Sequence, residues 1–276
     1  MLIDTHAHLN LPPFEKDLEE VIKRCREGNV WVINVGTHYE DSKRAVEIAE
    51  KYSEGIFAAV GLHPEHLGDG VAKLKLNGEE YIIKREKQFD YEKYKKLGKS
   101  PKVVAIGEIG LDYWHKPKTK KKLAEFKQKQ KELLLEQIKL AEELNLPIIF
   151  HCRLAHNDLI EVLKSEIPNS KPKGVIHCFT GSWEQARAYM DMGFYLGFNG
   201  LIFRLNLDEI IKKTPLEKIL IETDCPFLTP PQAKSGRNEP IFVRYIAQKI
   251  AEIKKEPLKK IMEATTKNAM DLFKID

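Results

Sequence analysis

The chain lacks the features that mark several common classes of protein. It contains only four cysteines among 276 residues, none in a CxxC spacing, which excludes the dense disulfide framework of small secreted domains. No apolar segment reaches the roughly 20 residues that a membrane-spanning helix needs, and no charged leader precedes the first apolar run at Leu2. We therefore expect reduced thiols, a cytoplasmic protein and no membrane partner.

A strong net charge is also lacking, because 45 lysines and arginines face 41 aspartates and glutamates and leave a net charge of +4. This excess is too small to attract nucleic acid through bulk electrostatics, so any preference for anions must come from local groups. One basic block runs from Lys116 to Lys122. It opens a predicted helix, where the macrodipole disfavours positive charge, and it forms either a solvated surface or a rim that attracts phosphate groups.

Eight short apolar runs alternate with helical patterns. The longest helical pattern covers about residues 119–144, and another covers 257–273 near the end of the chain. Regular alternation of this kind implies parallel βα units, and the length suits one α/β barrel with insertions. We therefore predict a single (β/α)8 TIM-barrel domain over residues 1–276, with an extra C-terminal helix. The predicted strands lie near residues 2–5, 30–35, 56–61, 103–107, 148–150, 174–177, 194–197 and 219–222.

One stretch interrupts this alternation, between the third and fourth predicted strands. Residues 71–84 carry apolar side chains on both sides of Asn77-Gly78, a pair that is typical of a two-residue hairpin turn. We predict a β-hairpin insertion that emerges from the active-site face of the barrel. It could be a lid over the substrate, a contact between subunits or a decoration without a role, and the sequence leaves these alternatives open.

Several of the apolar runs lead into residues that bind divalent metals. Carboxylates and imidazoles at the carboxyl ends of separate parallel strands converge only if those strands close into a barrel, where the active site lies on that face. The first run contributes two histidines at an i, i+2 spacing, which directs both rings to one side. The predicted metal ligands are His6, His8, Glu108, His151, His177 and Asp224.

Six ligands are too many for one tetrahedral ion. Two divalent ions a few ångströms apart, with a carboxylate bridging them, would use all six. Histidine suits zinc and other transition metals, whereas carboxylate oxygens also admit magnesium or manganese. We therefore predict two divalent cations, with zinc, magnesium and manganese as the candidates.

Other residues lie directly beside these predicted ligands. Cys152 and Cys178 each follow a ligand histidine, and because neighbouring residues on a strand point to opposite faces, we predict that both cysteines pack against the helix layer. Asp4 and Glu222 each lie two residues from a ligand on the same strand. They either orient ligands or water or make buried structural hydrogen bonds.

Four residues are candidates for contact with a substrate. His63 ends the third predicted strand, where it either touches the substrate or makes a structural hydrogen bond. Arg153 and Arg237 could each hold a phosphate through two hydrogen bonds, or could join loops through salt bridges. Tyr113, with its neighbour Trp114, could stack on bases of an unpaired strand, or could pack beneath its loop.

Seven motifs in this order resemble the TatD-related metal-dependent deoxyribonucleases of the amidohydrolase superfamily, and the resemblance covers nearly the whole chain. The motifs are Asp4-Thr5-His6-Ala7-His8, Gly61-Leu62-His63-Pro64, Gly107-Glu108-Ile109-Gly110-Leu111-Asp112-Tyr113, His151-Cys152-Arg153, His177-Cys178-Phe179-Thr180-Gly181, Glu222-Thr223-Asp224-Cys225-Pro226 and Arg237-Asn238-Glu239-Pro240. The resemblance implies one metal held by His6, His8, Glu108 and Asp224, and a second held by Glu108, His151 and His177. Glu108 would be the bridge.

The resemblance also implies hydrolysis of DNA. Two cations lower the pKa of a shared water enough to supply hydroxide near neutral pH, and Asp224 could accept the proton of that water, which makes Glu108 and Asp224 the predicted catalytic residues. Because a barrel mouth is narrow, we predict an exonuclease that acts on single-stranded DNA ends. The alternative is a small-molecule hydrolase of the same superfamily that cleaves a C–N, lactone or phosphotriester bond. The sequence leaves the oligomeric state open, a monomer included.

Overall fold

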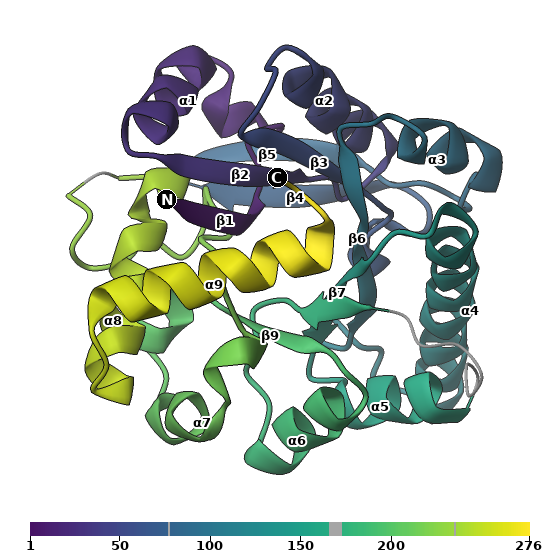
Figure 1. Ribbon diagram of the computed structural model, residues 1–276. Coiled ribbons are helices and arrows are strands. Elements are labelled where there is room, and N and C mark those ends of the chain that lie inside the picture. The colour runs from purple at the N-terminus through teal and green to yellow at the C-terminus, as the bar shows by residue number, and fades with distance from the viewer. Residues whose placement is uncertain (77, 166–172, 235) are drawn as a thin grey trace.

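Figure 1 shows the computed structural model, which describes residues 1–76, 78–165, 173–234 and 236–276. Within these residues, eight parallel strands form one sheet in the order β1-β2-β3-β6-β7-β8-β9-β10, which confirms the predicted TIM barrel. β6 runs five residues further than predicted, because its end pairs with β7 as far as Arg153. The strands are β1 Leu2–Ala7, β2 Val30–Val35, β3 Ile56–Val60, β6 Val103–Asp112, β7 Ile148–Arg153, β8 Gly174–Ile176, β9 Tyr195–Phe198 and β10 Ile219–Ile221.

The barrel closes between β1 and the segment that follows β10. The backbone nitrogen of Asp224 donates to the carbonyl of His6 at 2.8 Å, and the backbone nitrogen of His8 donates to the carbonyl of Cys225 at 2.8 Å. Three of the predicted metal ligands are thus held by the hydrogen bonds that close the barrel.

The helices surround the barrel, and several begin or end at typical capping residues. Ser182 and Gln185 form a capping box at the start of α6. Asn145 ends α4 in the left-handed conformation, with φ 52°. None of the described helices is both long enough and apolar enough to cross a membrane. The α-helices are α1 Leu18–Glu27, α2 Tyr39–Glu50, α3 Tyr91–Gly98, α4 Lys120–Leu144, α5 His156–Ser165, α6 Trp183–Asp191, α7 Asp208–Lys213, α8 Val243–Lys254 and α9 Leu258–Phe273, and the short 3-10 turns are η1 Pro12–Phe14, η2 Pro64–His66, η3 Gly200–Phe203, η4 Leu216–Lys218 and η5 Pro240–Phe242.

Alternation along the strands creates two apolar cores. In β1, Leu2 packs in the core between the strands and the surrounding helices, and Ile3 packs in the core inside the barrel. The predicted C-terminal helix, α9, lies across one end of the barrel (Figure 1) and contributes Leu272 and Phe273 to the inner core. Helix α9 meets the amino ends of β1 and β10, because Thr266 donates to the carbonyl of Met1 and Asn268 donates to the carbonyl of Ile219. The predicted ligands lie at the opposite, carboxyl end.

The predicted hairpin is present as the antiparallel strands β4 Val71–Leu76 and β5 Glu79–Lys84, although Asn77 of its turn lies outside the described residues. The segment beyond β5 is fastened by Glu86, whose Oε1 accepts hydrogen bonds from the backbone nitrogen of Tyr39 at 2.5 Å and the hydroxyl of Tyr94 at 2.8 Å. The hairpin therefore projects from a base that is fixed to α2 and α3.

Candidate metal centre

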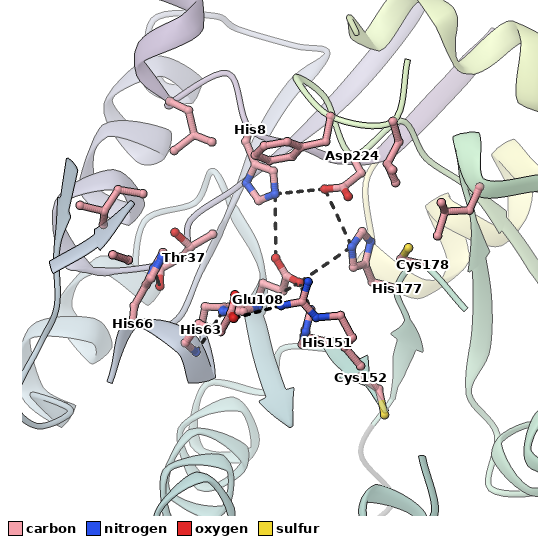
Figure 2. A pocket seen from close by; sticks show the side chains of 18 of the residues that line it. His8, Thr37, His63, His66, Glu108, His151, Cys152, His177, Cys178 and Asp224 are labelled. Atoms are coloured by element: carbon pink, nitrogen blue, oxygen red, sulfur yellow. Dashed lines mark hydrogen bonds and ion pairs between the residues drawn. The ribbon is translucent and has the colours of Figure 1, made fainter. Parts of the chain in front are cut away.

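A buried cluster of histidines and carboxylates lies at the carboxyl end of the barrel, in a cavity of about 470 Å³. Figure 2 shows that these side chains point toward one another from separate elements. Glu108 comes from β6, His151 from β7 and Asp224 from the segment after β10. The structure brings all six predicted ligands together: His6, His8, Glu108, His151, His177 and Asp224.

The end of β1 supplies two imidazoles that face the same side. Nε2 of His6 lies 3.1 Å from Nε2 of His8, as expected for side chains two residues apart on a strand. Asp224 completes this group, because its Oδ1 lies 3.3 Å from Nε2 of His8 and 3.9 Å from Nε2 of His6. The three donor atoms are close enough together to hold one cation.

Glu108 directs its two carboxylate oxygens to different histidines. Oε2 lies 3.4 Å from Nε2 of His6 and 3.9 Å from Nε2 of His8. Oε1 lies 2.6 Å from Nδ1 of His151 and 3.8 Å from Nε2 of His177. A carboxylate with nitrogen donors on both sides has the arrangement needed to bridge two metal ions.

Groups outside the cluster orient three of its imidazole rings. Each of these rings has its outer nitrogen next to an acceptor: Nδ1 of His8 lies 2.8 Å from the carbonyl of Val35, Nε2 of His151 lies 2.8 Å from Oδ2 of Asp112, and Nδ1 of His177 lies 2.8 Å from Oε1 of Glu222. In a neutral ring the proton is then on the outer nitrogen, and the inner nitrogen is a lone pair directed into the cluster. Metal-binding histidines are oriented in this way.

The electrostatics of the cluster favour positive charge among its members. Burial alone would raise the pKa of Glu108, but the surrounding histidines hold that pKa well below its usual range. Burial alone would likewise raise the pKa of Asp224, but His8 and His177 lower this pKa below its usual value. Although burial disfavours a charged His177, Glu222 and Glu108 raise the pKa of this ring to about 10. The ionised carboxylates therefore create a field that attracts cations or protons.

His63 follows β3 and lies beside Glu108. Its Nδ1 accepts a hydrogen bond from the backbone nitrogen of Glu65 at 3.2 Å, so the proton of the neutral ring is on Nε2. That nitrogen lies 3.7 Å from Oε1 of Glu108. Burial, together with the charge of His151, holds the pKa of His63 well below its usual range. His63 thus presents a neutral N–H donor to the cavity, which suits contact with a substrate.

Arg153 is held at the edge of the cavity by two carboxylates. Its Nε donates to Oδ2 of Asp112 at 2.7 Å, and its Nη2 lies 3.0 Å from Oε1 of Glu65. The side chain is still 40% exposed and lines the cavity. It therefore lies where the sequence predicts a contact with phosphate.

Two other predicted substrate residues do not line this cavity. Arg237 donates to Oδ1 and Oδ2 of Asp17 at 2.9 and 2.7 Å and lies over the ring of Phe14. It therefore joins the loop after β10 to the segment before α1. Tyr113 is buried, and its hydroxyl donates to Oδ2 of Asp158 at 2.9 Å. For both residues the structure favours the alternative role, a salt bridge between loops for Arg237 and packing beneath the loop for Tyr113.

The prediction for Cys178 is wrong. β8 ends at Ile176, and Cys178 has a left-handed backbone with φ 49°, so the alternation of a strand no longer sets its direction. Its side chain lines the cavity beside His177, as Figure 2 shows. Cys152 lies as predicted, because it is buried and accepts a weak hydrogen bond from the hydroxyl of Tyr189 on α6 at 3.9 Å.

The two acids beside the ligands differ in role. Asp4 accepts hydrogen bonds from the backbone nitrogen of Thr223 at 2.8 Å and from its hydroxyl at 2.5 Å, which joins β1 to the segment after β10. Burial raises the pKa of Asp4 to about 8. Glu222 faces His177 and also accepts from the backbone nitrogen of Cys178 at 2.7 Å. Asp4 is thus a structural group, and Glu222 orients a ring of the cluster.

Asp112 is absent from the predicted site residues, although it contacts both His151 and Arg153. It is fully buried at the end of β6, and its Oδ1 also accepts from the backbone nitrogen of Trp114 at 2.8 Å. Its position four residues after Glu108 on one strand places both side chains on the same face. That spacing is the signal by which the sequence could have identified it.

The chain matches a known family of proteins along its whole length. The family model described as TatD related DNase matches residues 3–274. The chain is 43% identical to the uncharacterized metal-dependent hydrolase YabD of Bacillus subtilis, over 100% of both proteins. It is 32% identical to the 3'-5' ssDNA/RNA exonuclease TatD of Pantoea ananatis, over 99% of each.

A solved structure supports the same relationship. The crystal structure of YjjV, a TatD homolog from Escherichia coli K12, is similar with a TM-score of 0.82 and 31% sequence identity, and the alignment covers 100% of this chain and 98% of that one. Fold, buried ligand cluster and full-length sequence similarity agree, and this chain therefore belongs to the TatD-related DNase family of metal-dependent hydrolases.

Proposed function

We propose that this protein hydrolyses phosphodiester bonds at the ends of single-stranded DNA by means of two divalent metal ions. The observation that carries the proposal is the position of Glu108, whose two oxygens face separate groups of histidine nitrogens. A carboxylate in this position can bridge a pair of ions, and pairs of ions stabilise both the attacking and the leaving oxygen of a phosphodiester.

The donor atoms of the cluster fit two divalent cations. Imidazoles outnumber carboxylates among the donors, which favours zinc over magnesium or manganese. The outer contacts of the rings hold the donors in place before any ion binds. We assign His6, His8, Glu108 and Asp224 to one ion, and Glu108, His151 and His177 to the other.

The surrounding side chains suit the hydrolysis of a phosphodiester. When bound, a pair of divalent cations lowers the pKa of water and neutralises charge on a phosphoryl group. Asp224, whose side chain is 16% exposed, accepts the proton that the attacking water loses. His63 donates from Nε2 to a phosphoryl oxygen, and Arg153 binds the adjoining phosphate from the edge of the cavity.

The shape of the site favours the end of a single strand. Helix α9 covers the opposite end of the barrel (Figure 1), and the hairpin forms one wall of the cavity through Ala72, Lys73 and Ile83. A chain end can enter a cavity of about 470 Å³, whereas an intact duplex is too wide for it. The name of the Pantoea ananatis relative, a 3'-5' ssDNA/RNA exonuclease, supports this choice and makes RNA a second substrate to test.

The test compares linear and circular single-stranded oligonucleotides of the same sequence. Protein stripped of metal with a chelator is reloaded with zinc, manganese or magnesium, and the bound metal is counted by mass spectrometry. We expect two ions per chain, release of mononucleotides from the linear strand, and no activity in the stripped protein. Glu108→Gln should lose at least one ion and about 1,000-fold or more in kcat, whereas Asp17→Asn, a carboxylate change outside the cavity, should lose neither.

Two results would overturn the proposal. Cleavage of the circular strand as fast as the linear one would exclude action at chain ends. Turnover of a small amide, lactone or phosphotriester with no turnover of any oligonucleotide would identify the protein as a small-molecule hydrolase of the same superfamily instead.

A further inference from the structure

Two large apolar side chains are exposed next to Arg153, which lines the metal cavity. Trp114 is 60% exposed and Leu154 is 64% exposed. The loops that carry them run side by side, because the backbone nitrogen of Tyr113 donates to the carbonyl of Arg153 at 2.9 Å. Leu154 also has a left-handed backbone, with φ 57°, a conformation that costs energy for a leucine. Exposed apolar groups beside a catalytic cavity indicate a surface that binds a ligand or a substrate.

The backbone of Trp114 is anchored, and its indole lies beside a cation. Its backbone nitrogen donates to the buried carboxylate of Asp112 at 2.8 Å, and the guanidinium of Arg153 lies 5.5 Å from the ring centroid. Arg153 is itself fixed by its bonds to Asp112 and Glu65. An exposed aromatic ring beside a cation is the combination on which bases of single strands stack, without regard to sequence.

A second cavity, of about 450 Å³, adjoins the metal cavity on this side. Thr180 lines both cavities. Leu154 lies on its wall, and so does Lys116, the first lysine of the basic block. A strand that leaves the metal cavity past Trp114 would therefore run toward positive charge.

The basic block occupies a position that does not favour the fold. Its last three lysines form the first turn of α4, which contains no acidic residue, and the helix macrodipole disfavours positive charge there. Within the part of the chain that the structure describes, the salt bridges include none of the five lysines: Lys116, Lys118, Lys120, Lys121 and Lys122. Exposed cations without partners, at the unfavourable end of a helix and next to the second cavity through Lys116, suit the binding of phosphates.

We propose that Trp114, Arg153 and the basic block from Lys116 to Lys122 form a second subsite, which binds the nucleotides that flank the bond to be cleaved. A base stacks on Trp114, and the phosphates run toward Lys116 on the wall of the second cavity and toward the lysines that follow it. This inference rests on the proposed function and adds which residues outside the metal cavity hold the strand beyond the cleaved bond.

The kinetic test uses two substrates, a twelve-residue single-stranded oligonucleotide and bis(4-nitrophenyl) phosphate, which is too small to reach the second subsite. In Trp114→Ala, the ratio of kcat/KM for the oligonucleotide to kcat/KM for the small diester should fall about tenfold, mainly through KM for the oligonucleotide. Trp114→Phe, which keeps an aromatic face, should recover most of this loss.

The lysines are tested through the salt dependence of binding. The triple variant Lys120→Gln, Lys121→Gln and Lys122→Gln should raise KM for the oligonucleotide and flatten the plot of log KM against log salt concentration. The control triple variant Lys255→Gln, Lys259→Gln and Lys260→Gln removes the same charge near the other end of the barrel and should leave that slope as it is in the wild type. Equal effects of the two triple variants would refute a local role for the block.

A binding measurement keeps this inference separate from the proposed function. In the variant Trp31→Phe, Trp183→Phe, Trp114 is the sole tryptophan, and its fluorescence in metal-stripped protein should be quenched by the oligonucleotide but not by an abasic oligonucleotide of equal length. Equal quenching by both, or none, would refute stacking on Trp114 even if the enzyme digests DNA. Quenching by the oligonucleotide alone, in an enzyme that cleaves only small esters, would uphold the subsite and refute the proposed function.

Discussion

The carboxylate of Asp112 accepts a hydrogen bond from Nε2 of His151 at 2.8 Å. Burial alone would raise the pKa of Asp112, but its bonds with His151 and Arg153 lower that pKa to about 2, so the group is ionised at neutral pH. An ionised acceptor keeps the ring proton of His151 on Nε2. Nδ1, which lies 2.6 Å from Oε1 of Glu108, is then the nitrogen that gives up its proton when a metal binds, and Asp112 thereby sets which nitrogen is available to a metal.

Asp112→Asn should therefore weaken metal binding by about 10- to 100-fold, the usual cost of removing a group that orients a metal-binding histidine. The affinity is measured by competition with a chromogenic chelator. Asp158→Asn is the matched control, because Asp158 also accepts hydrogen bonds from two side chains of this region, Tyr113 and Lys127, but lies away from the cluster. Equal affinity in Asp112→Asn and wild type would show that His151 needs no such partner.

The barrel and the ligand cluster were predictable because both depend on short-range patterns. Each strand is a run of apolar residues, and each ligand follows such a run. Because the carboxyl ends of the strands meet at one face of a barrel, predicting the barrel also predicts that the ligands lie together. His6 and His8 needed only the alternation of a strand. The same alternation would have identified Asp112, four residues after Glu108 on β6.

The remaining site residues depend on information that no local pattern contains. Arg237 is bonded to Asp17, which lies 220 residues away in the sequence, so its partner could not be read from its neighbours. The side chain of Cys178 points into the cavity because its backbone is left-handed, and no motif in the neighbouring sequence predicts that conformation. Tyr113 and Trp114 are adjacent in sequence, yet one is 5% and the other 60% exposed, a difference that only the loop geometry decides.

His63→Ala should lower kcat for an oligonucleotide by about 100- to 1,000-fold, which is the usual effect of removing one donor that stabilises developing charge. Because Nδ1 of His63 is occupied by the backbone of Glu65, the variant should retain the full number of metal ions. His63→Gln restores an N–H donor and should recover part of the lost activity. Loss of an ion in His63→Ala would instead show that His63 binds a metal ion together with Glu108 and His151, whose donor atoms lie close to its own.

The hairpin offers a matched pair of neighbouring isoleucines. Ile83 lines the metal cavity, whereas Ile82 points to solvent and is 67% exposed. Ile83→Ser should raise KM for the oligonucleotide several-fold, because it removes apolar area from the wall of the cavity, and Ile82→Ser should leave KM unchanged. If both variants or neither raised KM, the hairpin would not act as a wall for the substrate.

His156 should make the stability of the protein depend on pH between about 4 and 6.5. Its imidazole is buried beside Phe179 and Tyr189, with Nδ1 3.2 Å from the hydroxyl of Tyr189, and burial, reinforced by the charge of His151, lowers its pKa from 6.5 to about 4. In this window the unfolded chain binds a proton that the folded chain does not, so the free energy of unfolding falls as the pH falls. The shift corresponds to at most about 3 kcal/mol between pH 7 and pH 4. Urea unfolding of metal-stripped wild type and His156→Gln isolates this effect, because the other titrating groups are common to both proteins. The free energy of unfolding of the wild type, relative to that of the variant, should decline as the pH falls from 6.5 to 4. Parallel plots of this free energy against pH would show that His156 is protonated without cost in the folded protein.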